Sequence, residues 1–297
     1  MDIRHLRCFA TLAEELHFGR AAERLHIEQS PLSRTIKELE EELGAQLFDR
    51  DRRGTRLTRA GDVFLQDVRR VFVTMKQACE NARAVYAGTR GILRVAISDG
   101  AIDPRLSSFL ACCREDEPEI EVRMTETSSA EQLRGLRSGD FDIGIAYTDE
   151  VNDGVIAEPL WRDPIMSILP ARHPLLVHKE VALDELLRFP LVLCNPQICE
   201  GYHRALSRIL WSLGREPVVV DHVSSTELML ALVAAGYGVG FMSLPRTKIY
   251  RYPNVVVRPL ASGDALLTTY LLRMEGRVSS FPLDRFTHRL CAQNEEK

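Results

Sequence analysis

The residues between positions 29 and 37 have side chains suited to contact with nucleic acid. Gln29 can form paired hydrogen bonds with adenine N6 and N7, and Arg34 can do the same with guanine O6 and N7. Short hydroxyls and a lysine suit phosphate oxygens, which fix the register of a protein on DNA. These phosphate candidates are Ser30, Ser33, Thr35 and Lys37. The residue types and their spacing therefore predict a segment that reads double-stranded DNA in the major groove.

Such a segment needs a rigid helix, and the apolar spacing predicts three short ones. Residues 3–16, 18–25 and 31–43 each repeat apolar side chains at three- and four-residue steps. Ser30 is expected as the N-cap of the third helix, and Pro31 as its first residue, where a missing N–H costs nothing. Gly44 is expected to end it. The last two helices, around a tight turn, predict a helix-turn-helix whose final helix enters the groove.

An arginine-rich hairpin is expected after the third helix. Two short strands, beginning at Leu47 and at Thr55, flank a predicted turn with Arg52 and Arg53 at its tip. Five arginines and one acid lie within residues 50–59, whereas the whole chain has a formal net charge of −4. Alone, this run favours a solvated hairpin. Beside a complete helix-turn-helix, a local basic patch on an acidic protein indicates a site-specific DNA binder.

Residues 59–87 are predicted to form one long helix that pairs with a second copy of the chain. Seven apolar residues follow one another in steps of four and three, as in a coiled-coil seam. They are Phe64, Val68, Val71, Met75, Ala78, Ala82 and Val85. No obvious partner within the chain exists for this seam, so dimerisation is favoured over packing on the helix's own domain. Residues 1–58 would then be the winged helix-turn-helix, 59–87 the dimerisation helix and 88–91 a hinge.

The remaining residues, 92–297, alternate strand-like and helix-like segments in two similar blocks. This order is typical of an α/β domain with parallel strands. Lobe I is expected at about 92–161 and 267–297, and lobe II at about 162–266, with two crossovers between them. The cleft between two such lobes is the expected binding site of a small ligand.

The chain resembles the LysR-type transcriptional regulators. The matching segments are AAERLHIEQSPLSRTIKELEEELGAQLFDR, DRRGTRLTRAG with the long helix after it, LRVAIS, GDFDIGIAY and STELMLALVAAGYGVGFMS. The resemblance implies a C-terminal effector-binding domain similar in fold to periplasmic binding proteins. It also implies a dimer of dimers, contact with RNA polymerase, and entry of Arg52 and Arg53 into a narrow A·T-rich minor groove. Residues 24–50 resemble the branch that controls breakdown of aromatic compounds.

From this resemblance, ten residues are expected around the effector. They are Ser98, Asp99, Gly100, Ser128, Ser129, Tyr147, Cys199, Gly201, Tyr202 and Ser224. Several end strands or begin helices, where α/β proteins hold ligands and anions, although helix capping explains each serine equally well. Family members that bind carboxylates usually have a small neutral residue where Asp99 stands. The sequence is therefore as compatible with a hydroxylated or amine-bearing effector as with an acid.

Several other functions are disfavoured. No nucleophile–base–acid set is visible, so an enzyme is not expected, and neither a metal nor another cofactor is predicted. The Gly236-x-Gly238-x-Gly240 spacing follows a helix and opens a strand, the reverse of a dinucleotide fingerprint. The charged N-terminus is unlike a signal peptide, and no apolar run approaches the roughly 18 residues of a membrane helix. With seven irregularly spaced cysteines, a cytoplasmic protein without a disulfide framework is expected.

Three alternatives remain open. Cys194 and Cys199 could form a peroxide-sensing pair, as in one branch of the same family, and the regulator would then be a redox sensor using Cys199. Ordinary buried thiols are favoured over this. A periplasmic-type binding protein or enzyme would need an export signal or a catalytic group. An architectural DNA binder would not need a two-lobed ligand domain.

Overall fold

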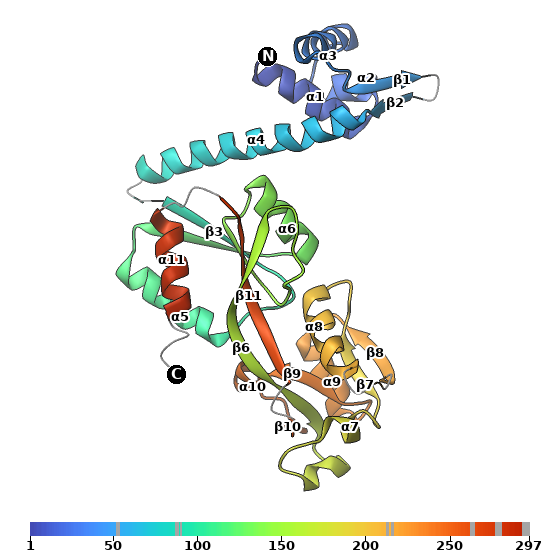
Figure 1. The fold of residues 1–297 in the computed structure, drawn as a ribbon, viewed down its shortest axis with the longest axis vertical. Coiled ribbons are helices and arrows are strands. Elements are labelled where there is room, and N and C mark those ends of the chain that lie inside the picture. The colour runs from blue at the N-terminus through green and yellow to red at the C-terminus, as the bar shows by residue number, and fades with distance from the viewer. Residues whose placement is uncertain are drawn as a thin grey trace. The chain divides into compact units, whose positions relative to one another are not determined.

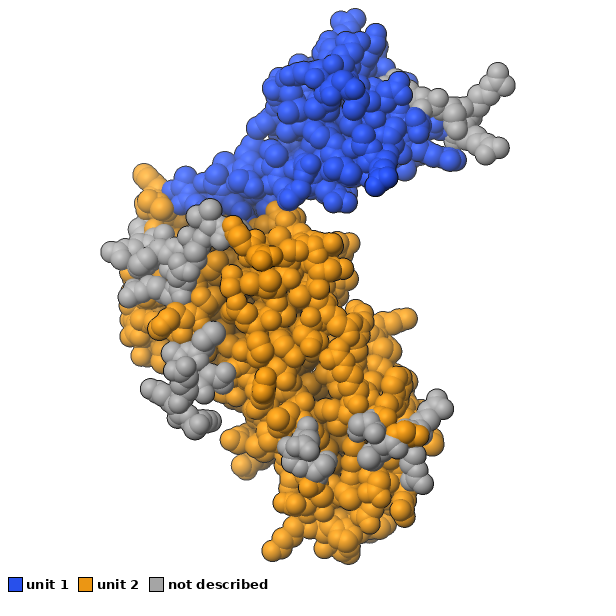
Figure 2. All heavy atoms as spheres, in the orientation of Figure 1, with its two compact units in different colours: residues 1–82 blue, residues 83–297 orange. Residues whose placement is uncertain are grey.

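The chain divides into two compact units, Met1–Ala82 and Arg83–Lys297 (Figure 2). The computed structural model describes all residues except 52–53, 87–88, 90, 212–213, 215–216, 262–264, 277–280 and 293–297. Within the described part of the chain, no helix has both the length and the apolar character needed to cross a membrane.

The first unit is a three-helix core followed by a hairpin and the beginning of a long helix (Figure 1). Its elements are α1 (Ile3–Glu15), α2 (Phe18–Arg24), α3 (Gln29–Leu43), β1 (Phe48–Asp51), β2 (Gly54–Leu57) and α4 (Arg59–Tyr86). Phe9 and Leu12 of α1 pack with Leu32, Ile36 and Leu39 of α3, and all five are fully buried. The three- and four-residue spacing of Leu32, Ile36 and Leu39 is the pattern that predicted α3.

Helix α3 begins two residues earlier than the capping pattern predicted. Gln29 is its first residue, and Glu28 is an N-cap without a side-chain hydrogen bond. Ser30 and Pro31 are the second and third residues, so the assignment of Ser30 as N-cap is wrong. Pro31 is tolerated there because the N–H groups of the first turn have no acceptor within the helix. Gly44 ends the helix with a φ of 65°, as predicted.

The first turns of α4 have a partner within the chain. Leu65 and Val68 are buried in the core of the first unit, and the ring of Phe64 lies 5.0 Å from that of Phe9. The prediction that the whole seam lacks an intrachain partner is therefore wrong at its N-terminal end. Further along, Val71 and Met75 are 45% and 36% exposed and line an open groove with Asp67, Arg70, Thr74 and Ala78.

The second unit begins with lobe I, a mixed sheet covered by three helices. Its elements are β3 (Gly91–Ile97), α5 (Pro104–Asp116), β4 (Ile120–Glu126), α6 (Ser129–Ser138), β5 (Ile143–Ala146), the first half of β6 (Val155–Pro170), β11 (Leu266–Met274) and α11 (Phe281–Ala292). Strand β3 is parallel to β4 and β5, whereas β11 is antiparallel to β5 and β6. Helices α5 and α11 lie on one side of these strands and α6 on the other (Figure 1).

Lobe II contains the second half of β6 and the elements between β6 and β11. They are η1 (Pro174–Val177), α7 (Leu183–Leu186), β7 (Leu191–Cys194), α8 (Glu200–Leu210), β8 (Val219–Val223), α9 (Thr226–Ala234), β9 (Gly240–Ser243), α10 (Leu244–Ile249) and β10 (Val255–Pro259). Strand β6 pairs with β11 up to Pro164 and with β9 and β10 beyond it. One 16-residue strand therefore belongs to both lobes and forms one of the two predicted crossovers between them.

Candidate nucleic-acid interface and ligand cleft

The start of α3 presents most of the predicted DNA contacts to solvent. Gln29, Ser30, Pro31, Arg34 and Lys37 are exposed, and Ser33 is half-buried. Arg34 has no ion-pair partner among the residues that the structure describes, whereas Lys37 lies 3.4 Å from Glu41. Thr35 is only 9% exposed and faces the core, so the prediction of a phosphate contact by Thr35 is wrong.

The acidic side chains in the second half of α3 are engaged within the first unit. Glu40 Oε1 accepts the backbone N–H groups of Leu47 at 2.8 Å and Phe48 at 3.1 Å. Glu42 pairs with the N-terminal ammonium group. Glu40 therefore fixes the first residues of the hairpin against α3. The side chains predicted to contact DNA at the start of α3 are all neutral or basic.

The hairpin lies next to α3 in the sequence and carries further positive charge. Strands β1 and β2 are antiparallel, with Asp51 opposite Gly54. Arg52 and Arg53, predicted at the tip, lie outside the described residues. Arg56 on β2 is exposed. A helix that presents Gln29 and Arg34 beside a basic hairpin is an arrangement that suits the grooves and phosphates of a duplex.

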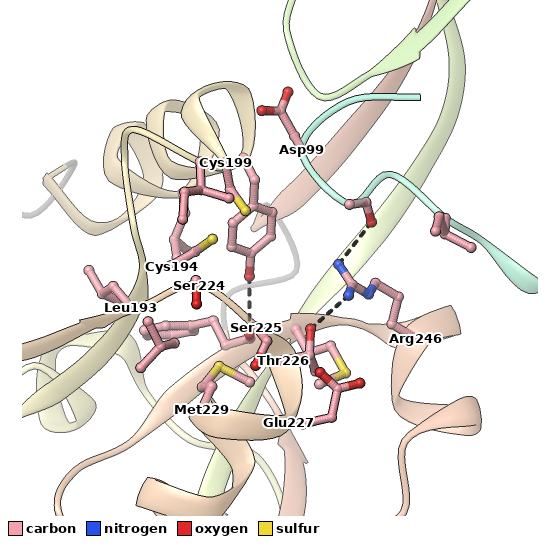
Figure 3. Close-up of a pocket in the computed structure, with 18 of the residues that line it drawn as sticks. Asp99, Leu193, Cys194, Cys199, Ser224, Ser225, Thr226, Glu227, Met229 and Arg246 are labelled. Atoms are coloured by element: carbon pink, nitrogen blue, oxygen red, sulfur yellow. Dashed lines mark hydrogen bonds between the residues drawn. The ribbon is translucent and has the colours of Figure 1, made fainter. Parts of the chain in front are cut away.

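A cavity of 640 Å³ lies between the two lobes of the second unit (Figure 3). Six of the ten predicted effector residues line it: Asp99, Gly100, Ser128, Cys199, Tyr202 and Ser224. The other four, Ser98, Ser129, Tyr147 and Gly201, are buried behind its wall. Sequence reasoning missed several lining residues, among them Glu126, Cys194, Thr226, Glu227, Met229, Phe241 and Arg246.

Asp99 joins the two lobes at one end of this cavity. Its carboxylate Oδ1 accepts the Ser129 hydroxyl at 2.9 Å from lobe I and the Gly201 backbone N–H at 3.1 Å from lobe II. Both donors lie in the first turn of a helix, α6 or α8, where the helix dipole favours negative charge. Asp99 is 3% exposed, and burial raises its pKa against the opposing effect of these hydrogen bonds.

The second carboxylate oxygen of Asp99 has a shared donor. The Ser98 hydroxyl lies 3.2 Å from Asp99 Oδ2 and 3.0 Å from Gln132 Oε1. Gln132 Nε2 donates to the carbonyls of Ala96 and Ile145, which leaves Oε1 as the acceptor for Ser98. Since one hydroxyl has one proton, Asp99 Oδ2 receives at most part of that hydrogen bond. Because Oδ2 is only weakly hydrogen-bonded, the charged form of Asp99 gains little stabilisation there, which is consistent with its raised pKa.

Arg246 of α10 forms a second link between the lobes. Its guanidinium donates from Nη1 to the carbonyl of Gly100 at 3.0 Å and from Nη2 to the Thr226 hydroxyl at 2.8 Å (Figure 3). No carboxylate pairs with Arg246 among the described residues, and its buried Nε has no hydrogen-bond partner there. A cation whose partners are neutral is suited to an anionic group of a ligand.

Tyr202 lines the cavity, and the ring of Tyr147 packs against it from behind the wall. The Tyr202 hydroxyl donates to the Phe241 carbonyl at 3.0 Å, and the rings of Tyr147 and Tyr202 lie 5.6 Å apart. Burial raises the pKa of Tyr147 to about 12, so this phenol stays protonated. Burial also raises the pKa of Tyr202, so both phenols are neutral, with Tyr202 in the wall and Tyr147 behind it.

Exposed ion pairs link the lobes outside the cavity. Glu150 after β5 pairs with Arg204 and Arg208 of α8, and Arg208 also lies 3.3 Å from Asp149. Such pairs contribute little each and are screened by salt, typically about 0–1 kcal/mol. The buried hydrogen bonds of Asp99 and Arg246 are thus the stronger links between the two lobes.

Cys194 and Cys199 face each other in the wall of the cavity (Figure 3). A hydrogen bond from the Cys194 thiol lowers the pKa of Cys199, and the same bond raises the pKa of Cys194. Both thiols are half-buried. Cys199 is the thiol that ionises more readily. Within the described part of the chain, no three His, Cys, Asp or Glu side chains are placed to hold a metal ion.

Comparison with known proteins matches both units to one family. Residues 3–62 match the model "Bacterial regulatory helix-turn-helix protein, lysR family", and residues 87–293 match the model "LysR substrate binding domain". The chain is 32% identical over 275 residues to the regulator YnfL of Escherichia coli, covering 92% of each chain. It is 31% identical over 300 residues to the regulator CatR of Pseudomonas putida, covering 100% of each.

Solved structures agree with this assignment. The full-length OxyR of Pseudomonas aeruginosa is similar with a TM-score of 0.64 and 26% identity, over 98% of this chain and 94% of that one. Helix α3 lies within the part that matches the helix-turn-helix model, and the interlobe cavity lies within the part that matches the substrate binding domain. The chain therefore belongs to the LysR family of DNA-binding transcriptional regulators.

Proposed function

We propose that this regulator reads its operator through Gln29, Ser30, Pro31, Ser33, Arg34 and Lys37, with Arg52 and Arg53 in the flanking minor groove. The observation that supports this is the exposed start of α3, where Arg34 has no ion-pair partner among the described residues. Residues 1–58 are proposed as the DNA-binding domain, 59–87 as the dimerisation helix, 88–91 as the hinge and 92–297 as the effector domain. The protein would act in the cytoplasm, on DNA and alongside RNA polymerase.

Substitution of Arg34 tests the DNA contact. The variant Arg34→Ala is expected to lose about 1–3 kcal/mol of operator binding and its sequence preference. Lys37→Ala, which would remove a phosphate contact and an exposed pair with Glu41, should weaken specific and non-specific DNA binding alike and lower the salt dependence. A gel-shift titration in which Arg34→Ala binds its operator like the wild type contradicts the assignment.

The groove on α4 supports assembly into a dimer and then a dimer of dimers. Val71 and Met75 are exposed along one stripe of a helix whose first turns are already packed within the chain. An apolar stripe of this kind is stabilised when a second copy covers it. The proposed assembly places two DNA-binding units in each dimer, which matches a two-fold operator.

The interlobe cavity is the proposed effector site, with lobe I at 92–161 and 267–297 and lobe II at 162–266. Leu193, Met229 and Phe241 give it an apolar wall, which suits a flat ring and supports the branch that controls breakdown of aromatic compounds. Binding would shift the balance between two arrangements of the lobes, provided that the effector binds one of them better. A thermal-shift screen of aromatic metabolites tests this: the expected result is a concentration-dependent rise in Tm.

A redox sensor that uses Cys199 is the second candidate function. The observation in its favour is the lowered pKa of Cys199 beside Cys194, because the thiolate is the form that reacts with peroxide. Gel shifts under reducing conditions and after peroxide treatment distinguish the two functions. A redox sensor changes its DNA footprint on oxidation, whereas an effector sensor does not.

A further inference from the structure

The carboxyl group of Asp99 is held in the way that proteins hold the anionic group of a bound ligand. Its Oδ1 receives the Ser129 hydroxyl at 2.9 Å and the Gly201 N–H at 3.1 Å, from the first turns of two helices in different lobes. Helix N-termini with free N–H groups hold the anionic groups of bound ligands in many proteins. Here the anion belongs to the chain itself, and it is 3% exposed.

The backbone conformation at Asp99 and Gly100 places this side chain between the two lobes. Asp99 and Gly100 are successive residues with positive φ, 58° and 63°, and only Ser98 separates them from the end of β3. A non-glycine residue in this region carries strain, which persists only where surrounding contacts compensate for it. Lobe II donates a hydrogen bond to each residue of this turn. The Gly201 N–H donates to the Asp99 carboxylate, and Arg246 donates to the Gly100 carbonyl.

The close fit at Gly201 shows how completely Asp99 fills the space. A Cβ added to Gly201 would lie 2.4 Å from Asp99 Oδ2, nearer than real atoms approach. A second carboxylate therefore has no room between Gly201 and Ser129 while Asp99 is there. It would also face the charge of Asp99 in a buried, poorly screened setting.

We infer that Asp99 is a specificity-determining residue that takes the place of the effector's acidic group between α6 and α8. The effector then carries at most one acidic group, which pairs with Arg246 at the other link between the lobes. Diacids are excluded because one of their two carboxylates would have to displace Asp99. This inference deepens the proposed effector site and rests on it for the ligand class, whereas the Asp99 contacts do not depend on it.

The test is to remove the Asp99 carboxylate and to supply a free carboxylate that can bind between Ser129 and Gly201. Asp99→Gly suits the positive φ and leaves the two donors, Ser129 and Gly201, without an acceptor. The purified full-length variant is heated with increasing sodium acetate, with sodium chloride at equal ionic strength and with neutral acetamide. Asp99→Asn is the matched control, because its side chain has the same shape and tolerates positive φ.

The expected result is that acetate raises the Tm of Asp99→Gly by several degrees, in proportion to the logarithm of its concentration. Chloride and acetamide should not reproduce the rise, and the wild type and Asp99→Asn, in which only Arg246 is open to acetate, should respond less than Asp99→Gly. Equal acetate responses of Asp99→Gly and the wild type overturn the inference. If Asp99→Gly is unfolded in buffer, acetate must restore its fold, and a chain that stays unfolded in saturating acetate also overturns it.

These readouts need neither the operator nor the natural effector. Failure of acetate rescue would leave the DNA-binding function untouched, since that function is tested by Arg34→Ala. Conversely, a wild-type operator affinity in Arg34→Ala would not alter the acetate response. The two conclusions can therefore fail separately.

Discussion

Glu40 in α3 accepts the backbone N–H of Leu47 at 2.8 Å, and this contact ties the helix that is proposed to read DNA to the hairpin that follows it. The same carboxylate oxygen accepts the N–H of Phe48, the first residue of β1. A single side chain thus satisfies two backbone donors at the point where the chain turns into the hairpin. The relative orientation of α3 and the hairpin, which are both proposed to bind DNA, depends on it.

Removal of this carboxylate should therefore weaken both folding and DNA binding. Glu40→Ala leaves two N–H groups without their acceptor, and a hydrogen bond to a charged group is worth about 1.5–3 kcal/mol. Denaturation of the full chain and an operator titration measure the two losses. Glu41→Ala is the control, since it removes only an exposed pair with Lys37 and should change stability by about 0–1 kcal/mol. Equal effects of the two variants would contradict this role.

Charges placed in the α4 groove should dissociate the assembly. Val71→Glu with Met75→Glu puts carboxylates on the stripe that a second copy is proposed to cover, and like charges across an interface cost several kcal/mol. Sedimentation should show smaller particles and weaker operator binding. Val63→Glu alters a similarly exposed valine outside the groove, so its particles should keep the wild-type size. An unchanged assembly in the double variant would refute the proposed dimer interface.

A methyl group at Gly201 should destabilise the second unit through Asp99. Gly201→Ala places its Cβ 2.4 Å from Asp99 Oδ2, and overpacking of this kind costs about 1–3 kcal/mol. In the double variant with Asp99→Gly the clashing carboxylate is gone, so the two changes should be strongly non-additive. Additive losses in chemical denaturation would show that the two residues do not act on each other.

The stability of the wild type relative to Asp99→Asn should fall as pH rises. Burial raises the pKa of Asp99 in the folded chain, so the folded state binds its proton more tightly than the unfolded state, whose pKa is about 3.9. Stability is therefore lost as pH rises from that value through the raised pKa, and the loss is complete above it. The asparagine side chain of the variant does not titrate, so denaturation curves of both proteins over this range isolate the effect. Parallel curves would contradict it.

The helices of the first unit could be predicted because their signals are local. Leu32, Ile36 and Leu39 repeat at helical spacing, and Gly44 ends α3 with a positive φ, which glycine adopts without a steric penalty. The start of α3 could not be fixed from Ser30 and Pro31, because several first-turn positions accept the same residues. The partner of Phe64 was not predictable either, since Phe9 is distant in sequence and a heptad pattern does not say which surface covers it.

In the second unit the sequence placed strand ends and helix starts, and with them Asp99, Ser128 and Cys199 near a cleft. It did not find Arg246, a single basic residue after β9 whose contact with Gly100 spans the two lobes. Nor did it show that Asp99 binds Gly201, more than a hundred residues away. The sequence alone determined the family, the order of elements and the chemistry of α3, because local spacing and residue type decide these. Only the tertiary structure decided what Asp99 and Arg246 do, because their partners are brought within hydrogen-bond distance by the packing of two lobes.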